Sequence, residues 1–121
     1  MLWYPIVVSG LMGVALIGLW LMLLVRQAVP ELTAGLPSIR FHIAAELLTA
    51  VALLAGGIWV AVADGPTARV LDAASLGAIV YSTVNSPGYY ADRGNRTVVA
   101  MFGVLAILAV TAILVLVVTP D

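Results

Sequence analysis

The sequence predicts an all-α fold, a polytopic membrane protein built as a bundle of four transmembrane helices. Hydrophobic residues make up 64% of the chain and charged residues only 9%, whereas about a quarter of a soluble domain is charged. The mean hydropathy is +1.18. Four apolar stretches each approach the roughly 20 residues that cross a hydrocarbon core about 30 Å thick. We therefore expect the chain to lie in a lipid bilayer.

The four stretches define one domain covering residues 1–121, with spans expected at 5–25, 41–63, 70–89 and 97–118. The first and fourth spans contain no charged residue. The second is interrupted by three polar side chains, His42, Glu46 and Thr49. The third begins near Asp72 and carries several hydroxyl and amide side chains. Polar groups within a bilayer are costly, so a functional site is expected in these two spans.

The connections between the spans are short and contain proline and glycine, which favour turns. None is long enough to form a domain outside the membrane. The first span has no basic residue before its apolar run, and that run is longer than the core of a typical signal peptide. We therefore expect the first helix to be retained.

The arginines predict how the chain lies in a cell membrane. Arg26 and Arg40 flank the first loop, Arg93 and Arg96 lie in the third, and Arg69 alone is on the other side. Because basic residues favour the cytoplasmic side, the first and third loops are expected in the cytoplasm. Both termini are then outside the cell.

Composition also excludes several classes of protein. The chain has no cysteine, which removes disulfides, thiol catalysis and thiolate metal sites. A single histidine cannot build a multi-histidine metal site within one subunit. The chain has no basic tail or stripe that could follow a nucleic-acid backbone. No nucleophile with a matching base is visible, so an enzyme is the last of the hypotheses.

The sharpest candidate is Glu46. It lies six residues after Arg40, so about 9 Å deeper along the helix axis. His42 and Thr49 lie at i−4 and i+3 from it, on the same helical face. Glu46 is either a proton or cation site, or an interhelical clamp to His42, Tyr81 or Asn85. His42 could tune Glu46, or could ligate a haem or metal ion across a homodimer.

The third span brings further polar residues to the same side of the membrane, namely Tyr81, Asn85 and Ser86. Pro87 and Gly88 follow directly. Proline removes a backbone donor and disfavours helical angles in the residue before it, so the helix should break here, leaving the carbonyls near 83 and 84 free. Broken helices form ion and substrate sites in transporters. The alternative is that the helix simply ends at Asn85.

Two motifs of the chain support a resemblance to known proteins. They are Phe41-His42-Ile43-Ala44-Ala45-Glu46 and Asn85-Ser86-Pro87-Gly88-Tyr89-Tyr90. The pair resembles a pattern in small uncharacterised prokaryotic four-helix membrane proteins, over about the last two-thirds of the chain. That resemblance implies no function, but it implies that both motifs belong to one site. Small multidrug transporters and fluoride channels are similar in size, but their characteristic polar residues do not match this sequence.

The leading hypothesis is a homo-oligomeric channel or proton-coupled transporter for a small ion or small molecule, with Glu46 as the titrating group. Four short helices rarely enclose a pore, so the path would lie between copies. A second hypothesis is a structural or accessory membrane subunit whose polar cluster holds helices together. A third is a cofactor- or lipid-binding membrane protein. The sequence leaves the cofactor, if any, open.

Overall fold

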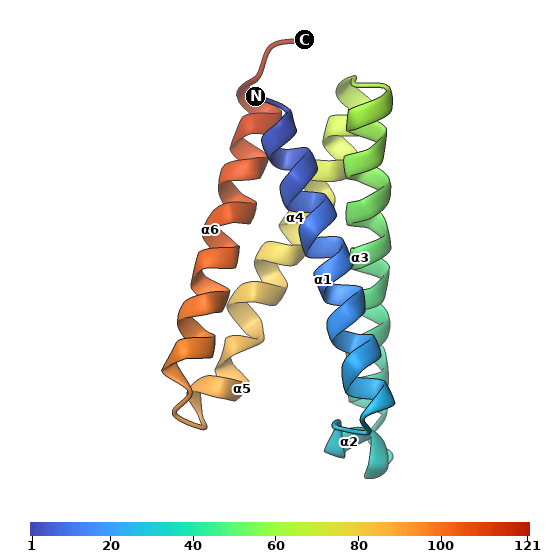
Figure 1. Ribbon diagram of the computed structural model, residues 1–121, viewed down its shortest axis with the longest axis vertical. Coiled ribbons are helices and arrows are strands. Elements are labelled where there is room, and N and C mark those ends of the chain that lie inside the picture. Colours follow the sequence, from blue (N-terminus) through green and yellow to red (C-terminus); the bar gives the residue numbers. More distant parts are fainter.

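The computed structural model describes all 121 residues, and it is all-α, as the sequence predicts (Figure 1). Four long helices run up and down the molecule, and two short helices lie in the connections. The long helices are α1 (Trp3–Val25), α3 (Pro37–Val62), α4 (Pro66–Asn85) and α6 (Arg96–Val118). The short helices are α2 (Pro30–Thr33) and α5 (Pro87–Ala91).

The helix starts follow local sequence signals. Proline is the first residue of α2, α3, α4 and α5, a position where its missing N–H is not needed and its fixed φ suits the helix. α6 starts instead with a side-chain cap, because Asn95 accepts a 3.3 Å hydrogen bond from the Val98 N–H. Gly35 and Gly94, in the turns before α3 and α6, have φ values of 73° and 72°. Glycine adopts such angles without a Cβ clash.

The long helices form a ring in which α1 packs on α3, α3 on α4, α4 on α6, and α6 back on α1. Both termini lie at the same end of the molecule (Figure 1). α1 and α6 are close at that end and diverge towards the other. Tyr4 ties them there: its hydroxyl lies 2.6 Å from Thr111 Oγ1 and donates to the Leu108 carbonyl at 3.2 Å.

Three of the four long helices, α1, α3 and α6, are long and apolar enough to cross a membrane. α4 has 20 residues but does not reach the same apolar character, because Arg69, Asp72 and several hydroxyl side chains interrupt it. Large apolar side chains such as Val62 and Leu11 point out of the bundle. Exposed apolar surface along three helices fits a lipid environment.

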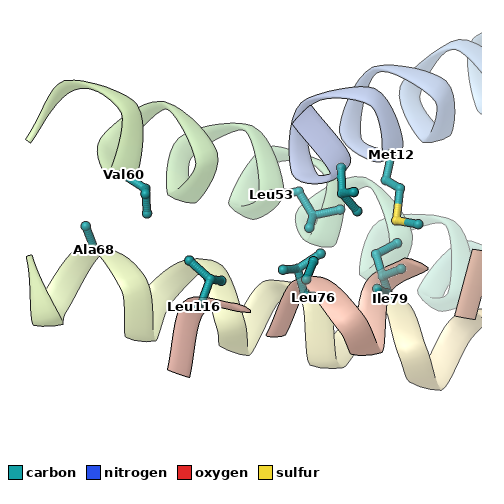
Figure 2. Packing of buried hydrophobic residues seen from close by; sticks show 10 residues of the cluster. Met12, Leu53, Val60, Ala68, Leu76, Ile79 and Leu116 are labelled. Carbon is teal, nitrogen blue, oxygen red and sulfur yellow. The ribbon is translucent and has the colours of Figure 1, made fainter. Parts of the chain in front are cut away.

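An apolar core fills the middle of the bundle (Figure 2). Leu53 of α3 and Leu76 of α4 are completely buried, and Met12 of α1 and Ile79 of α4 pack in the same cluster. Ala109 and Ala112 complete it from α6. Small residues there allow the α6 backbone to approach α4 closely. Two buried carboxylates, Glu46 and Asp72, lie beside this core.

Candidate functional site

Glu46 lies buried where α1, α3 and α4 meet, towards the end of the bundle that is opposite the termini. Its residue is only 9% exposed. Trp20 of α1 donates a hydrogen bond from its indole Nε1 to Glu46 Oε2. Ser82 of α4 donates from Oγ to Glu46 Oε1 at 2.7 Å. The carboxylate of an α3 residue therefore receives donors from two other helices.

His42 is the third neighbour of this carboxylate. One helical turn before Glu46 on α3, it places Nε2 3.4 Å from Glu46 Oε1. The His42 side chain is 41% exposed, against 11% for that of Glu46. Its ring also meets the Trp20 ring edge-on at 5.9 Å. His42 thus lies between the buried carboxylate and the surroundings of the bundle.

The break expected near Pro87 has a simple geometry in the structure. α4 ends at Asn85 and α5 begins at Pro87, with Ser86 between them in a helical conformation. No backbone N–H donates to the carbonyl oxygens of Thr83 or Val84, because proline has no N–H to offer one of them. Ser86 Oγ lies 3.5 Å from Ser82 Oγ, so the break adjoins the hydroxyl that binds Glu46.

The structure separates the other predicted residues from Glu46. The Thr49 hydroxyl donates to the Ala45 carbonyl of its own helix at 2.8 Å. Tyr81 is 73% exposed, and Asn85 is also exposed. Both face outwards from α4. They line a shallow groove of about 480 Å³ together with Val80 and Val84. Ser82, the residue after Tyr81, takes the position beside Glu46 instead.

Sequence reasoning did not place Trp20, Ser82, Ser9 or Asp72 in a site. The signal for Trp20 was its depth in an apolar helix, where an indole N–H needs an acceptor. In the structure Ser9 Oγ donates to Asp72 Oδ1 at 2.7 Å, and both residues are completely buried. The half of the bundle near the termini therefore contains a second buried carboxylate.

A third polar cluster lies outside the apolar core, at the end that carries both termini. The guanidinium of Arg69 donates two hydrogen bonds of 2.7 Å to the two oxygens of Asp64, in the turn between α3 and α4. It also donates to the Thr119 carbonyl at 2.5 Å and to the Pro120 carbonyl at 3.3 Å. The hydrogen bond from Arg69 lowers the pKa of Asp64 below its ordinary value of 3.8. Arg69 thereby connects the α3–α4 turn with the end of α6.

The chemistry available at Glu46 is proton exchange. The Glu46 carboxylate lies 2.7 Å from the Ser82 hydroxyl and 3.4 Å from the His42 imidazole. No group of three or more His, Cys, Asp or Glu side chains is arranged to hold a metal ion. The geometry therefore offers an acid–base pair, Glu46 and His42, on one face of α3.

Comparison with known families adds one finding. The sequence matches the family described as Domain of unknown function (DUF8058) over residues 2–121. The chain belongs to the DUF8058 family. The match covers nearly the whole chain. The expectation that the chain belongs to an uncharacterised family is therefore confirmed. No curated protein matches the chain, and no solved structure matches it either.

Proposed function

We propose that this protein is a homo-oligomeric membrane protein that moves a small ion or small molecule together with protons, with Glu46 as the group that binds and releases the proton. One observation carries the proposal: the Glu46 carboxylate is buried among three helices, with the half-exposed imidazole of His42 at 3.4 Å. Ionisable side chains inside membrane segments mark ion and proton pathways more often than they serve packing alone.

The proposal treats α4 as a fourth spanning helix. α4 packs between α3 and α6, and both neighbours are apolar enough to cross a membrane. Buried Arg69, Asp72 and Ser75 account for part of its lower apolar character, and protein-facing polar groups are tolerated in a span. The connections α3–α4 and α4–α6 lie at opposite ends of the bundle, as a crossing helix requires.

Orientation follows from the arginines. Arg26, Arg40, Arg93 and Arg96 lie at the end opposite the termini, and we assign that end to the cytoplasm. Both termini are then outside. In this orientation His42 and Glu46 lie in the cytoplasmic half, and His42 gives protons from the cytoplasm a route to the buried carboxylate.

Two or more copies are part of the proposal because one copy has no visible pore. Its apolar core is closed by completely buried Leu53 and Leu76. The outward face of α4 presents the phenol of Tyr81 and the amide of Asn85 in a groove beside Val80 and Val84. An amide facing hydrocarbon lacks hydrogen-bond partners, so covering it with a second copy is favourable. The substrate path would run along this face, next to the α4–α5 break.

The first experiment is native mass spectrometry of the protein in mild detergent, followed by proton-flux measurements in liposomes with an enclosed pH-sensitive dye. We expect a homo-oligomer and a proton flux that Glu46→Gln abolishes, because glutamine keeps the shape but cannot exchange a proton. Asp64→Asn is the matched control, since it removes a carboxylate outside the apolar core. A monomer, or equal flux in wild type and Glu46→Gln, would overturn the proposal.

A second candidate function is an accessory subunit, in which the polar cluster only holds helices together. The observation that favours it is that both oxygens of Glu46 accept hydrogen bonds from other helices. For an accessory subunit, Glu46→Gln lowers the free energy of unfolding without changing any flux. Measuring both quantities on the same variant separates the two functions.

A further inference from the structure

Asp72 is the most deeply buried carboxylate of the protein, with 0% of the residue exposed. Its Oδ1 accepts the 2.7 Å hydrogen bond from Ser9. Its Oδ2 is buried and has no hydrogen-bond partner. Buried polar atoms without partners are rare, and each one needs an explanation.

Two glycines of α3 explain how the carboxylate comes to be enclosed. A Cβ on Gly56 would lie 2.9 Å from the Asp72 Cα, and a Cβ on Gly57 would lie 3.2 Å from the Ser9 Cβ. The absence of side chains at both positions lets α1 and α4 approach α3 together. Ser9 and Asp72 therefore meet in a tight three-helix contact.

No cation compensates a negative charge at Asp72. Arg69, one turn earlier on α4, directs its guanidinium to Asp64, to the Thr119 and Pro120 carbonyls and, at 3.6 Å, to Asp121. From α1, the titratable side chain at this end is Tyr4, whose hydroxyl is engaged with α6. α3 has no ionisable residue after Glu46, and α6 has none after Arg96.

An ionised carboxylate enclosed without a counter-charge is far more costly than a neutral carboxylic acid in the same place. A proton on Oδ2 removes that charge, while Oδ1 remains an acceptor for Ser9. We infer that Asp72 is a second proton-binding site of the bundle, holding a proton on Oδ2 while α1, α3 and α4 are in contact at Ser9, Gly57 and Gly56.

This site is separate from the Glu46 cluster. Gly56, which touches Asp72, comes ten residues after Glu46 on α3, about 15 Å along the helix axis. Leu53 lies between Glu46 and Gly56 along α3, and Leu76 and Ile79 lie between Asp72 and Ser82 along α4. All three belong to the apolar core (Figure 2). The inference goes beyond the proposed function, because Asp72 can hold its proton whether or not Glu46 moves one.

Protonation of Asp72 also has a structural consequence. Loss of its proton would leave a charge that only water or separation of the helices can stabilise. Proton binding should therefore keep α1 and α4 together at the end of the bundle near the termini, and deprotonation should loosen that end.

The test is infrared spectroscopy of the full chain in lipid, with all aspartates carrying ¹³C in the side-chain carboxyl. The chain has only three other aspartates, Asp64, Asp92 and Asp121, and all three are exposed, whereas Asp72 is completely buried. We expect a ¹³C-shifted carbonyl band of a protonated carboxylic acid at pH 7. That band should vanish in Asp72→Asn, move in frequency in Ser9→Ala, and persist in Asp64→Asn.

Absence of a protonated ¹³C-aspartate band in the folded wild-type protein at pH 7 would overturn the inference, and this outcome does not depend on any variant folding. Persistence of the band in folded Asp72→Asn would overturn it too, since the proton would then lie on another aspartate. A band that is present in Glu46→Gln at unchanged intensity would support the independence of the two sites. A band lost in folded Glu46→Gln would contradict it.

Discussion

Ser82 Oγ donates a 2.7 Å hydrogen bond to Glu46 Oε1, joining α4 to α3 inside the bundle. Removing a donor from a buried carboxylate leaves part of its desolvation uncompensated. We expect Ser82→Ala to lower the free energy of unfolding by about 1–3 kcal/mol. Unfolding in mixed detergent–SDS micelles, followed by circular dichroism, measures this change.

Ser75→Ala is the matched control for that experiment. Ser75 lies on the same helix, but its hydroxyl donates only to the Leu71 carbonyl of its own helix. Its removal should change the free energy of unfolding by no more than about 0.5 kcal/mol, the usual range for a substitution that breaks no special contact. Equal losses in Ser75→Ala and Ser82→Ala would show that the Glu46 contact adds nothing.

The second prediction concerns Trp20, whose indole is the other donor to Glu46. Trp20→Phe keeps an aromatic ring but removes the N–H, so we expect a loss of about 1–3 kcal/mol in the same assay. Trp59→Phe serves as the control, because Trp59 is 44% exposed, whereas Trp20 is only 7% exposed. If Trp20→Phe is as stable as wild type, the indole does not stabilise the buried carboxylate.

The helical content and many of the helix starts could be predicted from the sequence, because the length of an apolar stretch and the position of a proline act locally. Pro66 and Pro87 fix helix starts through their own φ angles and missing N–H groups. A membrane location also follows from composition alone, since three helices are long and apolar enough to cross a membrane. Composition alone does not establish whether α4 crosses the membrane, because Arg69 and Asp72 give this helix a composition between that of a span and that of a surface helix.

The candidate site was predictable only in part. The contact of His42 with Glu46 follows from the i, i+4 spacing on one helix. Which residue of α4 faces Glu46 depends on how that helix is rotated about its axis, and composition does not determine this. Ser82 therefore stands where Tyr81 and Asn85 were expected. Likewise, the Ser9–Asp72 pair depends on two glycines of a third helix, so no spacing within one segment reveals it.

The third prediction tests the close packing at Gly56. A Cβ there would meet the Asp72 backbone at 2.9 Å, and backbone cannot move aside as a flexible side chain can. Gly56→Ala should therefore lower the free energy of unfolding by about 1–3 kcal/mol, the usual effect of overpacking. Gly77→Ala is the control, because nothing lies within 4 Å of its Cβ position. Alanine favours the helix by up to about 1 kcal/mol there. Gly77→Ala should therefore raise the free energy of unfolding, whereas Gly56→Ala lowers it. A stabilised Gly56→Ala would contradict the three-helix contact.

The fourth prediction concerns pH and the Asp64–Arg69 pair outside the apolar core. Because the pKa of Asp64 is lower in the folded protein than its ordinary value of 3.8, the pair stabilises the fold fully above that value. The contribution is lost as the pH falls through the lower, folded-state pKa. Wild type should therefore exceed Asp64→Asn in melting temperature at pH 6, and the difference should shrink below about pH 3.8.

Arg69→Lys should also lower the melting temperature at pH 6, since lysine cannot donate both 2.7 Å bonds in the same planar geometry. Thermal melts in detergent between pH 6 and pH 2.5, at constant ionic strength, measure the difference. A gap that stays constant down to the lowest pH would mean that the ionised Asp64 carboxylate does not stabilise the junction between the α3–α4 turn and the end of α6.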